Sequence, residues 1–206
     1  VFDVEADNLL EDATKIHCLS YTADGSSPVT LFKYDDMREL ILSQRGLVGH
    51  NIIAYDVPLL EKLLGIEIKA ILFDTLSMSW VLNYTRSKHG LESFGEDFDI
   101  PKPVVDDWSD QDIQVYAHRC EEDVKINWAL WQDLLSRFKF IYKDDKLLDK
   151  FFRYLQFKMS CAATAENVGW RLDKQLAEDS ITTLDESFLR SIKTKANQYI
   201  IYADNC

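Results

Sequence analysis

The chain has 206 residues and a formal net charge of −12, and 47% of its residues are hydrophobic and 12% aromatic. This composition excludes an intrinsically disordered protein, and no apolar run approaches the roughly 18 residues of a membrane-spanning helix. The acidic charge also argues against tight binding of nucleic acid by the chain alone, because phosphate contacts usually need a basic face. The length allows one full domain and an additional piece.

The cysteines and the first residues indicate in which cellular compartment the protein is expected. Four cysteines are scattered without C-x-x-C spacing, which argues against a zinc site or a disulfide framework and for a reducing cytoplasm. The first residues lack a Met and a signal-peptide pattern, and they are typical of a strand. We therefore expect a cytoplasmic piece of a larger protein with no membrane contact.

Strand and helix signals alternate over the first part of the chain, as in an α/β sheet covered by helices. Strands are expected at residues 1–5, 15–22, 29–34, 47–51 and 71–74, and the turn between the second and third predicts a hairpin. Helices are expected from about Met37 to Gly46, at 57–64 and at 75–82.

The second part of the chain is expected to be helical. Residues 83–107 contain prolines, glycines and many charges, which predicts an irregular loop. Ser109 and Asp112 form a capping signature that opens a long helix to about Phe138. Beyond residue 144 only helical signals remain, at 147–165 and from the Asp173 cap to about Tyr202. We therefore expect one domain at 1–143 and a helical segment at 144–206.

The first candidate site residues are Asp3 and Glu5, two residues apart on an expected strand. Alternate residues of a strand point to the same face, and two carboxylates on one face repel each other unless a cation lies between them. Magnesium and manganese prefer oxygen ligands of this kind. A solvated strand face is the alternative interpretation, because a D-x-E pattern alone is weak.

Two further acids lie where a carboxylate needs an explanation. Asp56 follows the strand that ends near Asn51, and sites of α/β sheets form where strands end and helices begin. A helix N-cap is the bland alternative for Asp56. Asp123 lies in mid-helix among apolar residues, although Asp is a poor helix former. His118 precedes it by five residues and has a side chain suited to general-base chemistry near neutral pH, or it is simply a packed or exposed helix residue.

Taken in order, residues 1–5, 50–56 and 118–124 resemble the three exonuclease motifs of the DEDD superfamily of 3′–5′ exonucleases. The resemblance implies a ribonuclease H-like exonuclease fold, with a mixed central sheet flanked by helices. It also implies two divalent cations, magnesium or manganese, with Asp3 bridging both ions and Glu5, Asp56 and Asp123 completing the sites. Two-metal cleavage of a phosphodiester needs such a cluster of acids and little else.

Other segments resemble a phage-type family A DNA polymerase, whose proofreading exonuclease precedes the polymerase thumb. They are residues 73–76, 89–95 and 166–173. The resemblance implies that residues 144–206 begin the thumb, that the rest of the polymerase chain is a partner, and that the protein is a monomer in the cytoplasm of an infected bacterium. It further implies that Leu9 wedges against the terminal base and that Asn51 and Tyr55 contact the last nucleotides of a single-stranded DNA 3′ end.

One departure from the resemblance concerns the residue beside the nucleophilic water. Polymerase-linked members usually carry a Tyr four residues before the last acid, where this chain has Arg119. His118 instead fits the histidine subfamily, so the assisting residue is open between His118 and Arg119.

The expected function is metal-dependent removal of 3′-terminal nucleotides from single-stranded DNA, which releases 5′-mononucleotides. One ion would activate water and the second would stabilise the departing 3′-oxygen. Two alternatives remain open: an RNA-trimming exonuclease of the ribonuclease D type, which shares the four acids, and a catalytically idle scaffold domain.

Overall fold

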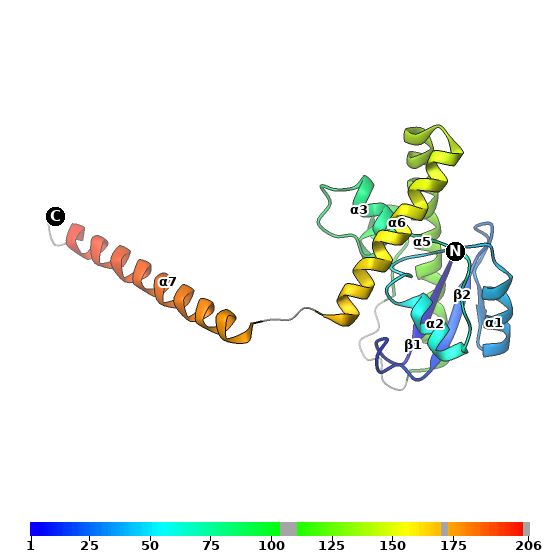
Figure 1. Cartoon of the computed structure of the whole chain (residues 1–206), viewed down its shortest axis with the longest axis horizontal. Helices are drawn as coiled ribbons and strands as arrows, with labels where there is room; N and C mark the ends of the chain where they lie inside the picture. Colours follow the sequence, from blue (N-terminus) through cyan, green and yellow to red (C-terminus); the bar gives the residue numbers. More distant parts are fainter. Residues whose placement is uncertain (104–110, 170–172, 204–206) are drawn as a thin grey trace. The chain divides into compact units, whose positions relative to one another are not determined.

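The computed structural model describes residues 1–103, 111–169 and 173–203 (Figure 1). The chain divides into two units, Val1–Thr164 and Ala165–Cys206. The division lies beyond the position near residue 144 that the sequence predicts, because the helix that starts at Asp145 buries Leu148, Phe152 and Leu155 in the first unit. The relation of the later residues to a polymerase thumb stays a prediction.

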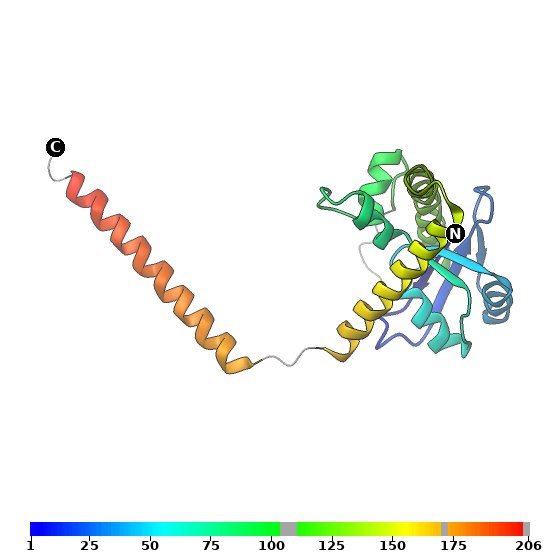
Figure 2. The same ribbon diagram turned by 45° about the horizontal axis from the view of Figure 1, so that its top comes forward.

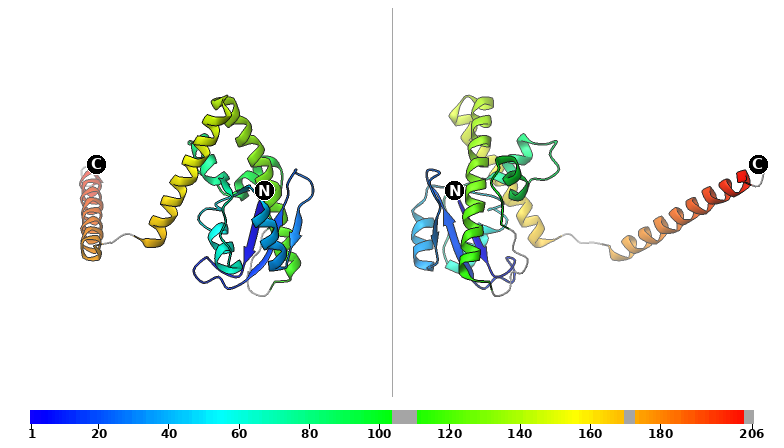
Figure 3. Two further views of the ribbon diagram at one scale, coloured as in Figure 1. Left: turned by 45° about the vertical axis from the view of Figure 1, so that its right-hand side comes forward. Right: turned by 180° about the vertical axis from the view of Figure 1, so that it is seen from behind.

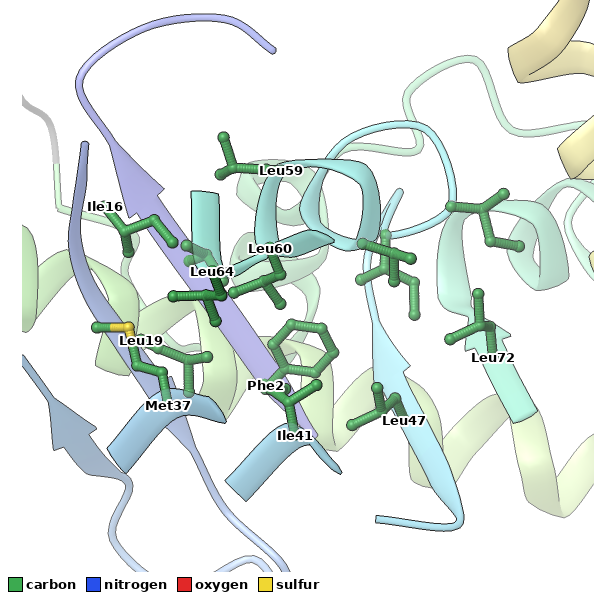
Figure 4. Close-up of a cluster of buried hydrophobic side chains, with 14 of the residues drawn as sticks. Phe2, Ile16, Leu19, Met37, Ile41, Leu47, Leu59, Leu60, Leu64 and Leu72 are labelled. Atoms are coloured by element: carbon green, nitrogen blue, oxygen red, sulfur yellow. The ribbon is translucent and has the colours of Figure 1, made fainter. Parts of the chain in front are cut away.

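Five strands form the central layer of the first unit. Three antiparallel strands lie in the order β1-β2-β3, and two parallel strands pair as β4-β5. Their bounds are β1 Phe2–Ala6, β2 Ile16–Tyr21, β3 Val29–Leu31, β4 Gly46–Gly49 and β5 Ile71–Asp74. Strand β4 lies beside β1 (Figure 4), so the strands follow one another as β3-β2-β1-β4-β5. Both parallel and antiparallel pairs occur, as the resemblance implies for the sheet.

Helices cover both faces of these strands. Their bounds are α1 Tyr34–Ser43, α2 Asp56–Leu64, α3 Thr75–Leu82, α4 Leu91–Phe98, α5 Ile113–Tyr142, α6 Asp145–Val168 and α7 Lys174–Ala203. One face of the sheet packs on α1 and α2 through a core that includes Phe2, Leu19, Met37, Ile41 and Leu60 (Figure 4). The long helix α5 runs across the opposite face (Figure 3). The strands are therefore enclosed between two helical layers.

A second core lies around the C-terminal half of α5. Helices α3, α4 and α6 pack against it (Figure 2), and Phe138 and Phe152 meet there edge to face, with ring centroids 5.6 Å apart. Edge-to-face aromatic pairs of this kind add a favourable quadrupole term to the burial of apolar area.

Helix α4 lies within residues 83–107, where the sequence predicts an irregular loop. Leu91 and Phe94 are buried three residues apart on its inner face. The sequence does not predict this helix because it contains Gly95, and glycine is a poor helix former. Its small size is needed here, since an added Cβ would lie 2.6 Å from the carbonyl oxygen of Ile100 and 3.0 Å from Cδ1 of Ile126.

Some element ends differ from the sequence prediction. The expected strand at 29–34 stops at Leu31, because Tyr34 starts α1 and its hydroxyl accepts a hydrogen bond from the Ile16 amide at 2.8 Å. Helix α5 starts at Ile113, capped by the Asp112 carboxylate. The predicted cap at Ser109 lies outside the described residues.

The last helix follows the sequence closely. The Asp173 carboxylate accepts the Leu176 amide at 3.0 Å at the start of α7, as its predicted cap role requires. Among the helices that the structure describes, none combines the length and the apolar character needed to cross a membrane.

Candidate active site

Strand β1 separates an apolar face from an acidic one. Phe2 and Val4 are buried in the core against α1 and α2, and the alternation of the strand turns Asp3 and Glu5 to the opposite face. Helix α5 lies against that face, where the Cys120 thiol donates to the Asp3 carbonyl oxygen at 3.2 Å. The two acids therefore face a helix that carries a further predicted ligand.

Asp123 on α5 completes a cluster of three carboxylates. It is buried one turn beyond Cys120, and one ligand oxygen from each of Asp3, Glu5 and Asp123 lies within 4.8 Å of the other two. Residues that are more than a hundred positions apart in the sequence thus meet at one point. Three of the four acids that the sequence predicts as metal ligands are thus brought together, and their role as ligands stays a prediction.

Asp56, the fourth predicted ligand, lies next to this cluster but is not one of the three. It is the first residue of α2 and is buried. The backbone of Val4 on β1 lowers the pKa of the Asp56 carboxyl group, against the rise that burial causes. The charge of Asp56 raises the pKa of Asp3, so the fourth acid is close enough to act on the others.

Burial raises the pKa of all four carboxyl groups, and repulsion from neighbouring acids adds to the rise. Burial is the largest cause at each of them, and for Asp3, whose pKa lies well above its ordinary range, the charges of Asp123, Asp56 and Glu5 add to it. The pKa of Glu5 rises to about 7 and that of Asp56 to about 8. Such a group of desolvated acids is stabilised by any cation that enters it.

The donor set fits a divalent cation of the hard class. Every ligand is a carboxylate oxygen, which magnesium and manganese prefer. Oδ1 of Asp123 is buried and has no hydrogen-bond partner among the described residues. A buried acceptor without a partner is costly, and a cation bound between the carboxylates would satisfy it.

Two basic side chains lie against the acids. Nζ of Lys102 is 2.6 Å from Oδ2 of Asp123, and Nε of Arg119 is 3.4 Å from Oε1 of Glu5. The positive charges oppose the rise in the pKa of Asp123 and Glu5 respectively. Lys102 is absent from the site that the sequence predicts, because an isolated lysine between two prolines gives no local signal.

The structure separates the two candidates for the assisting residue. The Arg119 side chain is mostly buried beside Glu5, whereas the His118 side chain is 63% exposed. Nδ1 of His118 lies 3.9 Å from Oε1 of Glu122, and Glu122 is outside the cluster. This placement argues against His118 as the general base, and its role stays an untested prediction.

Two of the predicted substrate contacts, Leu9 and Tyr55, lie at the loop that follows β1. Leu9 is 75% exposed there, and the Tyr55 hydroxyl donates to the carbonyl oxygen of Asn8 at 2.8 Å. Lys62 on α2 donates to the carbonyl oxygens of Leu10 and Glu11, each at 2.8 Å, which ties the same loop to α2. Leu9 and Tyr55 are therefore brought to one edge of the molecule.

The segment between β4 and α2 is organised by a buried carboxylate that the sequence does not place in the site. Asp74 accepts the amides of Asn51 and Ile53, each at 3.2 Å, and those of Leu76 at 3.0 Å and Ser77 at 3.3 Å. Asn51 takes a φ of 64° there. One side chain thus caps α3 and shapes the segment that leads to Asp56. The strand-to-helix junction at Asp74 and Thr75 is the signal that could have indicated it.

A polar chain links the same strand ends to α5. Nδ1 of His50 lies 2.9 Å from the Thr75 hydroxyl, which is 2.7 Å from Oδ1 of Asn127, one turn beyond Asp123. Burial, and then the charge of Lys102, lowers the pKa of His50 to about 4. These contacts hold the ends of β4 and β5 against the helix that supplies Asp123.

Comparison with known proteins identifies the fold. No protein-family model and no curated protein sequence matches the chain. Among solved structures, NrnC of Brucella melitensis with bound Mg²⁺ is similar at a TM-score of 0.59 and 17% identity, over 82% of this chain and 85% of that one.

Two other solved structures agree. NrnC bound to pGG gives a TM-score of 0.60 at 17% identity, over 82% of this chain and 84% of that one. A structure described as the apo form of the nuclease gives 0.60 at 15% identity, over the same shares. Identities this low show the fold alone. The chain has the ribonuclease H-like exonuclease fold that the sequence predicts.

Proposed function

We propose that the chain is a metal-dependent 3′–5′ exonuclease acting on single-stranded nucleic acid. The observation that carries this proposal is the cluster of Asp3, Glu5 and Asp123, with ligand oxygens within 4.8 Å of one another and Asp56 buried beside them. Proteins rarely bury several carboxylates side by side, since the cost of desolvation is high. The fold is the one on which the superfamily resembled by the three motifs carries its four acids.

The roles of the residues follow from their positions. Two bound divalent cations would supply an activated water and stabilise the departing 3′-oxygen. Asp3, Glu5 and Asp123 would hold them, with Asp56 as the further ligand. Arg119 cannot serve as a base because its guanidinium stays protonated, and from beside Glu5 it is suited to hold the scissile phosphate.

The 3′ end is proposed to lie against Leu9 and Tyr55. An exposed leucine next to an aromatic ring can wedge and stack a terminal base without reading its identity. The loop that carries Leu9 is held by the Tyr55 hydroxyl and by Lys62, so it offers a preformed surface. Asn51 lies at the start of the same segment as Tyr55 and is proposed as a second contact.

The chain's acidity and its neighbours favour a short oligonucleotide, and RNA over DNA. With a net charge of −12 the long-range field repels phosphate, so affinity must come from the metals and a few local contacts. NrnC, which shares the fold, is bound to pGG in one structure. RNA trimming is therefore favoured over DNA proofreading within a polymerase. The proofreading interpretation rests on the resemblance of segments such as residues 89–95.

The test is cleavage of matched RNA and DNA single strands of one sequence, and of pGG, with Mg²⁺ or with EDTA. We expect stepwise release of 5′-mononucleotides from the 3′ end, with RNA and pGG cleaved faster than DNA. The Asp123→Asn variant serves as the control and should be inactive. A preference for DNA would restore the proofreading interpretation, and absence of cleavage of every substrate would leave a scaffold domain.

A further inference from the structure

Lys102 occupies an unusual place for a lysine. It lies in the segment that follows α4, and its Nζ is 2.6 Å from Oδ2 of Asp123. The side chains of Lys102 and Asp123 are only 18% and 6% exposed. Lysines usually keep their ammonium group in water. This one points into the carboxylate cluster.

The backbone around Lys102 is held in place. Pro101 and Pro103 flank it and restrict the local backbone, because the proline ring fixes φ. Nη1 of Arg119 donates to the carbonyl oxygen of Pro103 at 2.5 Å, and the amide of Ile100 donates to the carbonyl oxygen of Gly95 at 2.9 Å. The ammonium group is therefore presented by an anchored segment, not by a surface chain that folds back by chance.

The charge of Lys102 acts on the cluster as a whole. It lowers the pKa of Asp3, Glu5 and Asp123, against the rise that burial causes. The other oxygen of Asp123 has no partner among the described residues. A single ammonium thus neutralises part of a group of acids that would otherwise repel one another across a few ångströms.

We propose that Lys102 is the resident cation of the metal-free site and that a divalent cation displaces its ammonium group from Asp123. The inference rests on the proposed function in that it takes the same carboxylates as metal ligands. An ammonium and a dication that share one carboxylate repel each other strongly at such short distances. Lys102 therefore competes with the metal, lowers the apparent metal affinity and keeps the cluster intact until the metal arrives.

The first test measures Mn²⁺ binding by electron paramagnetic resonance at pH 8, without nucleic acid, for wild type and Lys102→Met. Methionine keeps the length and removes the charge. We expect the Mn²⁺ dissociation constant of the variant to fall about tenfold or more, the factor that one modest ion pair represents. An unchanged or raised dissociation constant would overturn the proposal.

Lys125→Met is the matched control. Nζ of Lys125 is also 2.6 Å from a carboxylate oxygen, on Glu122, but the side chain is 42% exposed and Glu122 is outside the cluster. This substitution makes the same change in net charge on the neighbouring surface. We expect its Mn²⁺ affinity to stay within about twofold of wild type, because exposed pairs contribute little. An increase in Mn²⁺ affinity as large as that of Lys102→Met would show a general charge effect and overturn the proposal.

The second test needs no variant and so holds even if Lys102→Met fails to fold without metal. Wild type is treated with an amine-methylating reagent at one fixed pH, in EDTA and in Mg²⁺, and the lysines are read by mass spectrometry. We expect Lys102 to be protected in EDTA and labelled several-fold faster in Mg²⁺, with Lys125 as the internal reference. Equal labelling of Lys102 in both conditions contradicts displacement.

Neither test depends on nuclease activity, so the two proposals fail separately. If the protein is an active nuclease but Lys102 neither competes with the metal nor is released by it, the inference is refuted and the proposed function still holds. A protein that binds Mn²⁺ more tightly after Lys102→Met, yet cleaves no nucleic acid, keeps the inference and refutes the function.

Discussion

The two faces of strand β1 differ in what they contribute to the protein. On one face Phe2 and Val4 enter the core against α1 and α2, where burial of apolar area stabilises the fold. On the other face Asp3 and Glu5 meet Asp123 under α5, where burial raises their pKa and opposes the charged state. One strand of five residues thus carries one face that stabilises the fold and one face on which burial opposes the charged state of its acids.

The largest expected effect is on activity, at the acidic face. We expect Asp3→Ala to lower the cleavage rate in Mg²⁺ by more than about 100-fold, since electrostatic terms of this kind contribute several kcal/mol. Its free energy of unfolding in EDTA should stay level or rise, because one of several repelling charges is gone. Single-turnover cleavage and urea unfolding of the same preparation test both parts. A clear loss of stability, or a rate above a hundredth of wild type, would contradict direct metal ligation.

The adjacent residue should show the opposite pattern. Phe2 is buried in the core of the other face, and we expect Phe2→Ala to lower the free energy of unfolding by about 3–5 kcal/mol, as is typical of a large cavity. Mn²⁺ affinity of the fraction that remains folded should change little. Urea denaturation followed by circular dichroism gives the loss. If Phe2→Ala abolished metal binding in the folded state, the two faces would be coupled rather than separate.

A smaller effect on activity separates Arg119 from His118. Arg119 lies beside Glu5 and His118 is exposed near Glu122, so we expect Arg119→Ala to slow cleavage by about 10²-fold, the scale of losing one charged donor. His118→Ala should change the rate by less than about threefold, the size expected of a surface substitution. Parallel single-turnover rates decide the matter. Collapse of activity in His118→Ala alone would restore the histidine as general base.

The smallest expected effect is a pH dependence of stability without metal. Burial raises the pKa of Glu5 from its ordinary 4.5 to about 7 and that of Asp56 from 3.8 to about 8. The folded state therefore holds protons that the unfolded chain has already released, and stability falls as pH rises from about 4 to about 8. We expect the free energy of unfolding in EDTA to fall between pH 5 and 8.

The controls for this prediction are a substitution on the acidic face and the addition of metal. Asp56→Asn should flatten the fall in stability with pH in EDTA, and saturating Mg²⁺ should remove it, because the metal binds the ionised carboxylates. Unfolding curves at fixed ionic strength give the slope. A stability that rises over the same pH window would show that the four acids are not buried together in the metal-free protein.

Local sequence patterns determined the two faces of β1 and most of the elements. A period of two residues separates Phe2 and Val4 from Asp3 and Glu5 without reference to any other part of the chain. The strand β5 and the helix α3 have the expected bounds, because their apolar runs are short and flanked by clear signals. The presence of an Asp in the middle of α5 also marked Asp123 as a residue whose position needs an explanation, and in the structure it is buried beside Asp3 and Glu5.

Other features exist only in three dimensions. Helix α4 depends on Gly95 lying against Ile126 of α5, and glycine alone predicts a break instead. Helix α6 joins the first unit through aromatic contacts with Phe138 and its neighbours, which no local pattern reveals. Here contacts between distant segments override the local propensity.

The sequence by itself determined the fold class and indicated the four acids as candidate ligands, since strand alternation and the order of the motifs are local properties. Only the tertiary structure decided which acids meet, that Arg119 rather than His118 lies beside Glu5, and that the Lys102 ammonium group lies against Asp123. The reason is physical. The energy of a buried charge depends on distances to groups far away in the chain, and those distances are set by how β1 and α5 pack.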